Sequence, residues 1–208
     1  MSDESLRGGI VLAGGFSVRF GSADKAVADL ADEAMITRVA RRVDEVVDEL
    51  VINCREEQAA SIRDALDPTA LAYRFAFDSV PDRGPLAGIE AGIVVTDAPY
   101  VAVLSCDTPF VEPALLEYLF ERAAGRDGAV PILDGEVQPT QAVYRAEAMA
   151  NACRESLAAD QHSIRAALEH IDWVAVNERD VRERASLESF ESVETTADLE
   201  RAERRLSE

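Results

Sequence analysis

A short apolar run that ends in two glycines most constrains the fold of this chain. Residues 9–13 read Gly-Ile-Val-Leu-Ala, and Gly14 and Gly15 follow directly. A continuous apolar run of this length is typical of a strand that is buried on both faces, as in parallel sheets covered by helices. The glycines predict a turn in which the backbone comes close to a ligand. We therefore expect the chain to begin an α/β fold.

Helical and strand-like patterns alternate along the rest of the chain. Helices are expected at 35–50, about 86–96, from Pro113 onwards, 146–159, 163–170 and near the C-terminus, and strands at 50–53, 74–77, 100–104, 129–133, 137–144 and 173–176. The residues Asp134, Gly135 and Glu136 predict a hairpin, which adds an antiparallel strand. Such alternation predicts a mostly parallel central sheet with helices on both faces. Because no composition shift marks a linker, we expect one domain over residues 1–208.

Acidic residues greatly outnumber basic ones. The chain has 40 Asp and Glu against 21 Lys and Arg, and its formal net charge is −19. This charge disfavours binding to nucleic acid or to a membrane surface. The acids lie among apolar periodic segments, which indicates a folded domain with an acidic surface. We interpret that surface as halophilic, an adaptation to high intracellular salt.

The sequence predicts a cytoplasmic protein. Its apolar stretches are far shorter than the ~20 residues that cross a bilayer, and no basic-then-apolar leader is visible. Cys54, Cys106 and Cys153 are far apart and lack the spacing of a zinc site or a disulfide framework. We expect three reduced thiols that pack inside the protein.

The segment 12–25 carries the most informative pattern. Gly14 and Gly15 can aim backbone N–H groups at a polyphosphate, and Arg19 and Lys25 add positive charge. Lys25 is the only lysine in the chain, which indicates a position that needs a compact point charge, although chance is the alternative. Neither a P-loop nor a Gly-x-Gly-x-x-Gly fingerprint is present. A plain glycine-rich turn is the other interpretation of this segment.

Asp107 is the candidate metal ligand. It follows the predicted strand 100–104, so we expect it at the carboxyl edge of the sheet, where open α/β folds bind ligands. Mg²⁺ commonly takes one or two carboxylates together with phosphates and water. The alternative is that Asp107 caps the turn before Pro109. Cys106 is expected to pack rather than to act as a nucleophile, because no His is near it in sequence.

Further candidates are expected at the same edge. Asn53 and Asp78 end the second and third predicted strands of the parallel part. Gly84, Pro85 and Leu86 open a helix, where glycine admits a close approach to a ligand. Turn residues and a plain helix start are the alternative interpretations.

These motifs, in this order, resemble those of the molybdenum cofactor guanylyltransferases, within the wider class of nucleotidyltransferases. The matching residues are Leu12 to Gly15, Ser17, Arg19, Gly21, Asp24 and Lys25 in the signature loop, Asp78, Ser79 and residues 84–89 in a second motif, 106–110 in a metal-binding motif, and Gln138, Pro139 and the strand ending at Tyr144 in an acceptor-facing element. The match covers about residues 9–145. It departs from the family at 192–196, where Ser-Val-Glu-Thr-Thr replaces Asn-x-Asn-Thr-Pro; Glu194 either substitutes as a carboxylate or belongs to a plain helix entry.

The resemblance implies a nucleotide-diphospho-sugar transferase-like fold, a Rossmann-like three-layer sandwich. Its nucleotide-binding half would span about 8–110 and its acceptor-binding half about 111–208. The implied reaction is the Mg²⁺-dependent transfer of GMP from GTP to the terminal phosphate of molybdopterin, with release of pyrophosphate. Arg19, Lys25 and Asp107 would be catalytic, with Asp107 as the metal ligand. The nucleotide would be held by Leu12, Ala13, Gly14, Gly15, Lys25, Asn53, Asp78, Gly84, Pro85, Leu86 and Asp107. Transient contact with other molybdenum-cofactor enzymes is also implied.

Other functions fit the same residues. The base or the acceptor can differ, as in a molybdopterin cytidylyltransferase or a guanylyltransferase that acts on cobinamide phosphate or phospholactate. A regulator that binds nucleotide without chemistry is an alternative of another class. The preferred nucleotide base distinguishes the cytidylyltransferase from the guanylyltransferases. Release of pyrophosphate would exclude a regulator that binds nucleotide without chemistry.

The acidic composition predicts that salt stabilises the protein. At ~1 M ionic strength the Debye length is about 3 Å, so the surface carboxylates repel one another only weakly. We expect partial unfolding in dilute buffer and a higher melting temperature in molar KCl, measured by circular dichroism. A melting temperature that does not rise with KCl would contradict this prediction.

Overall fold

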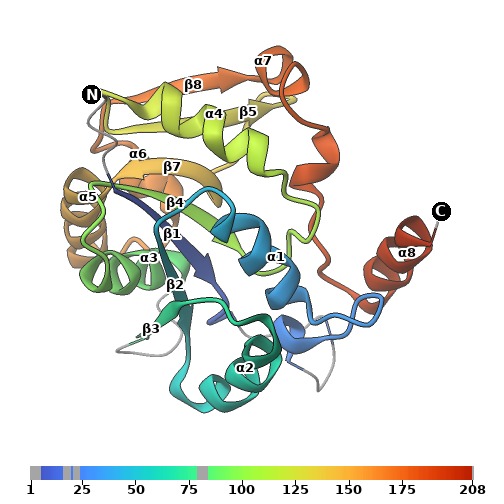
Figure 1. The fold of residues 1–208 in the computed structure, drawn as a ribbon. Coiled ribbons are helices and arrows are strands. Elements are labelled where there is room, and N and C mark those ends of the chain that lie inside the picture. The colour runs from blue at the N-terminus through green and yellow to red at the C-terminus, as the bar shows by residue number, and fades with distance from the viewer. Residues whose placement is uncertain (1–5, 16–19, 21–23, 79–83, 208) are drawn as a thin grey trace.

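The computed structural model describes residues 6–15, 20, 24–78 and 84–207 (Figure 1). Eight strands form one sheet in the order β3-β2-β1-β4-β7-β5-β6, and β8 pairs with β5. The strands are β1 (Arg7–Leu12), β2 (Glu49–Cys54), β3 (Tyr73–Phe77), β4 (Tyr100–Ser105), β5 (Gly128–Leu133), β6 (Glu136–Val137), β7 (Gln141–Arg145) and β8 (Trp173–Asn177). β1 to β4 are parallel, and β7 runs antiparallel between β4 and β5. The mostly parallel sheet with an antiparallel strand is thus confirmed.

Helices cover both faces of the sheet (Figure 1). The α-helices are α1 (Met35–Asp44), α2 (Ala59–Leu66), α3 (Gly84–Val95), α4 (Pro113–Ala123), α5 (Ala146–Ala158), α6 (Ile164–Leu168), α7 (Glu178–Arg182) and α8 (Thr196–Leu206), and the 3-10 helices are η2 (Lys25–Val27), η3 (Glu56–Gln58), η4 (Asp67–Thr69) and η5 (Leu187–Phe190). One apolar cluster packs the sheet against α1, α2 and α4, and another packs it against α3, α5 and α6. The predicted three-layer sandwich is therefore confirmed.

β1 is the central strand of this core. Val11 packs in the cluster under α1, whereas Ile10 packs in the cluster under α3, and both are fully buried. Close packing on both faces depends on glycine, because a side chain at Gly9 would overlap Val43 of α1, and one at Gly92 of α3 would press against Ile10. The apolar run at residues 9–13 is thus continuous because both faces of the strand are covered.

Two elements differ most from the sequence prediction. The helix predicted over 35–50 ends at Asp44, because the chain turns there and the Asp48 N–H pairs with the Arg7 carbonyl at the start of β1 (2.9 Å). The strand predicted over 137–144 is divided into β6 and β7 by residues 138–140. Pro139 has no N–H for a ladder bond, and its carbonyl instead accepts a hydrogen bond from the Tyr144 hydroxyl (2.7 Å).

The C-terminal helix α8 lies outside the three layers (Figure 1). A third, smaller apolar cluster attaches it to the body, with Val193 and Ala202 packing near Phe20, Leu30 and Met35. The segment after η5 thereby returns to the carboxyl edge of the sheet. Within the described ranges, no helix combines the length and the apolar character needed to cross a membrane.

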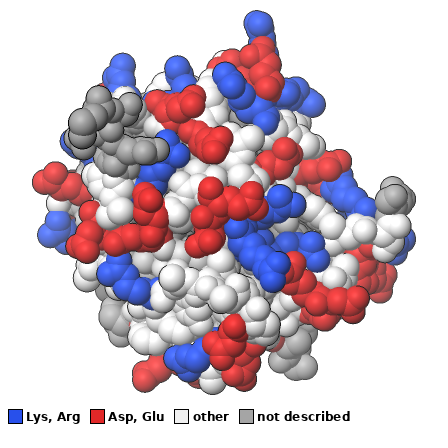
Figure 2. Space-filling view, viewed as in Figure 1, with Lys and Arg blue, Asp and Glu red and all other residues white. Residues whose placement is uncertain are grey.

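Charged side chains are mixed on the molecular surface (Figure 2). Several arginines pair with acids, as in α7, where Arg182 contacts Glu178 (2.7 Å) and Arg179 contacts Glu183 (3.3 Å). With 40 acids against 21 basic residues, pairing cannot neutralise the surface even when every cation is used. Exposed pairs of this kind contribute only about 0–1 kcal/mol each, so the surplus negative charge dominates the surface electrostatics.

Candidate functional site

Three parallel strands bring their carboxyl ends to one edge of the sheet. In β1, Leu12 lies opposite Asn53 of β2 on one side and Ser105 of β4 on the other. Backbone pairing continues past the strand ends. The Ala13 N–H donates to the Asn53 carbonyl (2.8 Å), and the Cys106 N–H donates to the Leu12 carbonyl (3.0 Å). The residues that follow each strand are held close together at the edge where open α/β folds bind ligands.

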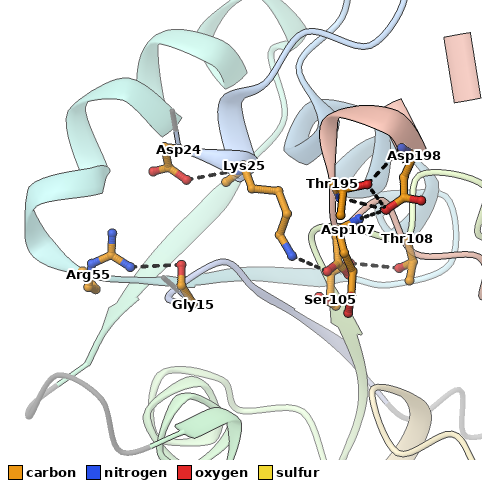
Figure 3. Close-up of polar contacts among 11 residues, drawn as sticks. Gly15, Asp24, Lys25, Arg55, Ser105, Asp107, Thr108, Thr195 and Asp198 are labelled. Carbon is orange, nitrogen blue, oxygen red and sulfur yellow. Dashed lines mark hydrogen bonds and ion pairs between the residues drawn. The ribbon is translucent and has the colours of Figure 1, made fainter. Parts of the chain in front are cut away.

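Lys25 and Asp107 meet at this edge, although 82 residues separate them in sequence. The Lys25 ammonium forms an ion pair and a hydrogen bond with the Asp107 carboxylate (Figure 3). Lys25 begins η2, and Asp24 caps that helix by accepting a hydrogen bond from the Ala26 N–H (3.1 Å). The structure thus joins the predicted phosphate-binding loop to the predicted metal ligand.

The environment of this pair keeps Lys25 charged. Its side chain is 21% exposed, and that of Asp107 is 10% exposed. Burial by itself lowers the pKa of Lys25, but the charge of Asp107 and the hydrogen bond to it outweigh burial, so the pKa of Lys25 is raised. The charge of Glu194 acts in the same direction. Lys25 is therefore a cation throughout the physiological pH range.

The turn that contains Asp107, from Ser105 to Thr108, is closed by a different side chain. The Thr108 hydroxyl donates to the Ser105 carbonyl (2.9 Å). The Asp107 carboxylate is directed at Lys25 instead (Figure 3). The structure therefore does not display the alternative role of Asp107 as a cap for the turn before Pro109. Its role as a metal ligand stays a prediction.

A small cavity lies between the strand ends and Lys25. Its volume is about 50 Å³, and it is lined by Leu12, Ala13, Gly15, Asp24, Lys25, Ala26, Ser105 and Cys106. Burial, reinforced by the charge of Asp107, raises the pKa of the Cys106 thiol to about 12. The thiol is protonated at neutral pH, which agrees with a packing role and not with a nucleophile. Cys54 and Cys153 are also buried free thiols.

Asn53 and Asp78 lie beside Gly14. Asn53 is 2% exposed, and its amide donates to the Ala76 carbonyl (3.2 Å) and to the Asp78 carboxylate (2.8 Å). A side chain at Gly14 would overlap Asp78, and one at Gly88 of α3 would overlap Asn53. Asn53 therefore orients Asp78, and Asp78 is the more accessible of the two.

In the motif that opens α3, Gly84 and Pro85 are exposed and Leu86 is buried. Gly84 has a left-handed backbone conformation (φ +72°) beside the His162 carbonyl, and Pro85 is exposed. Leu86 is fully buried in the core beneath α3, so its side chain is a packing group. Arg19 lies outside the described residues.

Two side chains at this edge were not predicted from the sequence. Arg55 donates from Nη1 to the carbonyls of Gly14 (2.6 Å) and Gly15 (3.1 Å), as Figure 3 shows for Gly15. Gln58 is 3% exposed and donates from Nε2 to Ala13 and Asp24. Both lie in a polar stretch with Glu56 and Glu57 that, by composition alone, is typical of a solvated loop. Their position directly after a parallel strand is the signal that could have identified them.

The segment that departs from the family pattern also reaches the site. The Val193 N–H donates to the Asp107 carbonyl (2.8 Å), and Glu194 lies near enough to raise the pKa of Lys25. Thr195 then caps α8, since its hydroxyl accepts from the Asp198 N–H (3.2 Å) while Asp198 accepts from the Thr195 N–H (2.8 Å). The segment is a helix entry, and its Glu194 carboxylate adds negative charge that raises the pKa of Lys25.

A larger groove runs along α8 from this point. Its volume is about 680 Å³, and it is lined by Phe110, Glu191, Ser192, Val193, Asp198, Arg201, Ala202, Arg204 and Arg205. Phe110 forms one wall and is covered by the Arg205 guanidinium, 5.0 Å from the ring centre. Val193 connects the groove to Asp107 through the hydrogen bond between their backbones.

Comparisons with known proteins agree with this arrangement. Residues 9–176 match the family model of the MobA-like NTP transferase domain. A protein of Natronomonas pharaonis named probable molybdenum cofactor guanylyltransferase is 47% identical over 201 residues, covering 97% of this chain and 98% of that protein. A protein of the same name from Haloferax mediterranei is 37% identical over 193 residues, covering 93% of this chain and 91% of that protein.

A solved structure gives the same result for the fold. The structure of molybdopterin-guanine dinucleotide biosynthesis protein A from Archaeoglobus fulgidus has a TM-score of 0.79 and 29% identity, covering 96% of this chain and 98% of that chain. The resemblance carried by the loop and strand-end motifs is therefore confirmed across nearly the whole chain. This chain belongs to the MobA-like NTP transferase family.

Proposed function

We propose that this protein transfers GMP from GTP to the terminal phosphate of molybdopterin and releases pyrophosphate. The observation that carries the proposal is the meeting of Lys25 with Asp107 beside the Gly14–Gly15 turn. This meeting supports the proposal because an ammonium, a carboxylate and a glycine turn lie together at one strand edge. The names of the relatives from Natronomonas pharaonis and Haloferax mediterranei support the choice of guanylyl transfer to the molybdenum cofactor.

The reaction needs alignment and charge stabilisation more than acid–base chemistry. An oxygen of the acceptor phosphate attacks the α-phosphorus of GTP, the bond from that phosphorus to the bridging oxygen breaks, and pyrophosphate leaves. The acceptor is already an anion, so no strong general base is required. Lys25 stabilises negative charge on the leaving pyrophosphate, and the loop amides help to hold the phosphates in line.

The residues present fit a magnesium ion shared with the substrate. Mg²⁺ prefers hard oxygen ligands and is commonly held by one or two carboxylates plus phosphates. The Asp107 carboxylate would be such a ligand, because it emerges at the strand edge close to the Gly14–Gly15 turn. When bound, the ion would supply Lewis-acid stabilisation of the phosphoryl oxygens.

The two halves of the chain receive different substrates in this proposal. Residues from about 8 to 110 bind the nucleotide, with Asp78, held by Asn53, and the start of α3 near the nucleoside. Residues from about 111 to 208 bind the acceptor in the same domain. The groove along α8 supports this assignment, because it joins Asp107 through Val193 and contains Arg201, Arg204 and Arg205, a residue type that suits a phosphate. Arg201 already pairs with Asp198, and Arg205 with Glu188 and Glu191, so a phosphate would exchange with these carboxylates. The three buried free thiols support a cytoplasmic setting.

The proposed function is tested by a transfer assay in molar KCl. The protein is incubated with Mg²⁺, molybdopterin and GTP, CTP or ATP in parallel, and pyrophosphate and the dinucleotide product are quantified. We expect GTP-selective formation of both. A preference for CTP would indicate the cytidylyl reaction instead, and nucleotide binding without pyrophosphate release would indicate a regulator.

Asp107→Ala is expected to lower kcat by at least about 10²–10³-fold without unfolding the protein. The bond that attaches the Val193 segment uses the Asp107 backbone carbonyl, which the substitution leaves in place. Removing a group that stabilises charge in the transition state costs about 10²–10³-fold in kcat. The transfer assay and a far-UV circular dichroism spectrum measure the two effects. Activity equal to the wild type would remove Asp107 from the metal site.

Lys25→Arg is expected to be damaging although it preserves the charge. The compact ammonium fits against Asp107, whereas a guanidinium is a longer planar fork. A misplacement of about 1 Å can cost about 10²-fold in rate, and we expect a loss of that order in kcat/KM for GTP. If the arginine variant keeps full kcat/KM, a positive charge of any shape is sufficient at this position.

A further inference from the structure

Gln58 joins three separate parts of the candidate site. Its Nε2 donates to the Ala13 carbonyl at the end of β1 (3.1 Å) and to the Asp24 carboxylate (2.7 Å). Its Oε1 accepts from the Arg55 N–H at the end of β2 (3.0 Å). The side chain is 3% exposed. An amide with two donors and one acceptor used in this way is a built contact and not a solvated polar residue.

The contact to Asp24 leads directly to Lys25. One Asp24 oxygen accepts from Gln58, and the other accepts from the N–H of Ala26 in η2. Asp24 is therefore fixed on both oxygens, and Lys25 is the residue between Asp24 and Ala26 in the chain. The Lys25 side chain reaches Asp107 from this backbone, so two residues separate the Gln58 amide from the ammonium along this path: Asp24 and Lys25 itself.

Arg55 fixes the adjoining turn from the same direction. Its Nη1 donates to the Gly14 and Gly15 carbonyls, and its side chain is 13% exposed. In a trans peptide the C=O and N–H groups point in opposite directions. The Gly15 N–H, which shares a peptide with the Gly14 carbonyl, consequently points away from Arg55. This arrangement leaves the amide available to an anion on the opposite side of the turn.

We propose that Gln58 is a positioning residue for the transfer reaction, which fixes the Asp24–Lys25 turn to the ends of β1 and β2 so that the Lys25 ammonium and the Gly14–Gly15 backbone act on one triphosphate. Arg55 completes this support by holding the two glycine carbonyls. The inference rests on the proposed function for the identity of the nucleotide. The positioning role of Gln58 can also be measured separately, because it affects nucleotide affinity as well as turnover.

The chemistry of Gln58 provides two informative substitutions. Gln58→Glu keeps the shape, but an ionised carboxylate cannot donate to Ala13 and it adds a negative charge beside Asp24. Gln58→Met keeps the length and removes all three hydrogen bonds. A protonated carboxyl regains one donor, so the glutamate variant recovers function as the pH falls, whereas the methionine variant does not. Asp24 and Arg55 are the charged groups that contact this position.

Thr37→Val is the matched control. Thr37 is 4% exposed, and its hydroxyl donates to the Ala65 carbonyl (3.0 Å), which ties α1 to α2. The substitution removes a buried side-chain hydrogen bond in the same layer of the protein without touching the strand edge. It is expected to lower the melting temperature by less than Gln58→Met, because one hydrogen bond is lost instead of three, and to leave nucleotide binding and turnover unchanged.

The test compares wild type, Gln58→Glu, Gln58→Met and Thr37→Val in molar KCl with Mg²⁺. Isothermal titration calorimetry gives GTP affinity, and pyrophosphate release gives kcat and KM for each substrate at pH 6 to 8. We expect both Gln58 variants to bind GTP about tenfold or more weakly and to lose about 10²-fold in kcat/KM for GTP, with the acceptor KM unchanged. Only Gln58→Glu should recover towards pH 6.

Equal GTP affinity in wild type and both Gln58 variants would overturn the inference, as would a loss of the same size in Thr37→Val. A wild-type protein that binds GTP but transfers nothing to molybdopterin would overturn the proposed function instead. In that case the affinity ratios still decide whether Gln58 positions the nucleotide site.

Discussion

The parallel pairing of β1 with β2 on one side and β4 on the other is the constraint on which the rest of the structure depends. Parallel strands present their carboxyl ends at the same edge, and helices must cover both faces because the connections cross over the sheet. Residues distant in sequence are thereby gathered at one place: the glycine turn after β1, Asn53 and Gln58 after or at the end of β2, and Asp107 after β4. Asp78, which follows β3, is held at the same edge by a hydrogen bond from the Asn53 amide.

Electrostatics act differently inside the site and on the surface. Lys25 and Asp107 are largely removed from water, and each would be costly to bury alone, so their direct contact keeps both charges in place. The pair is in contact, and molar salt screens such a pair much less than it screens the exposed acids. High salt therefore relieves the repulsion among the surplus carboxylates of the surface while the cation at the site is preserved.

Much of the fold could be predicted from the sequence, because the spacing of apolar residues and the positions of glycines depend directly on which residues are buried. The covered central strand, the alternation that builds three layers and the antiparallel strand are all confirmed. The predicted end of the first helix was wrong because the backbone hydrogen bond from Asp48 to β1 stops the helix before its apolar pattern ends. The predicted strand 137–144 was wrong because Pro139 interrupts the hydrogen bonding between strands. At the site, the sequence indicated that Lys25, Asp107, Asn53 and Asp78 share an edge, but it could not show that Asn53 is buried behind Asp78. Gln58 and Arg55 were missed because burial of a polar side chain in a charged stretch depends on tertiary contacts.

The most direct test of the central claim, that Lys25 and Asp107 belong to one nucleotide site, is thermal unfolding in molar KCl with Mg²⁺ and GTP. A ligand at one hundred times its dissociation constant stabilises the folded state by about 2.7 kcal/mol, which is a shift of roughly 5 to 10 °C for a protein of this size. We predict such a shift with GTP, a smaller one with CTP or ATP, and its loss in Lys25→Ala. No shift with any of the three nucleotides, or an equal shift in wild type and Lys25→Ala, would contradict the claim.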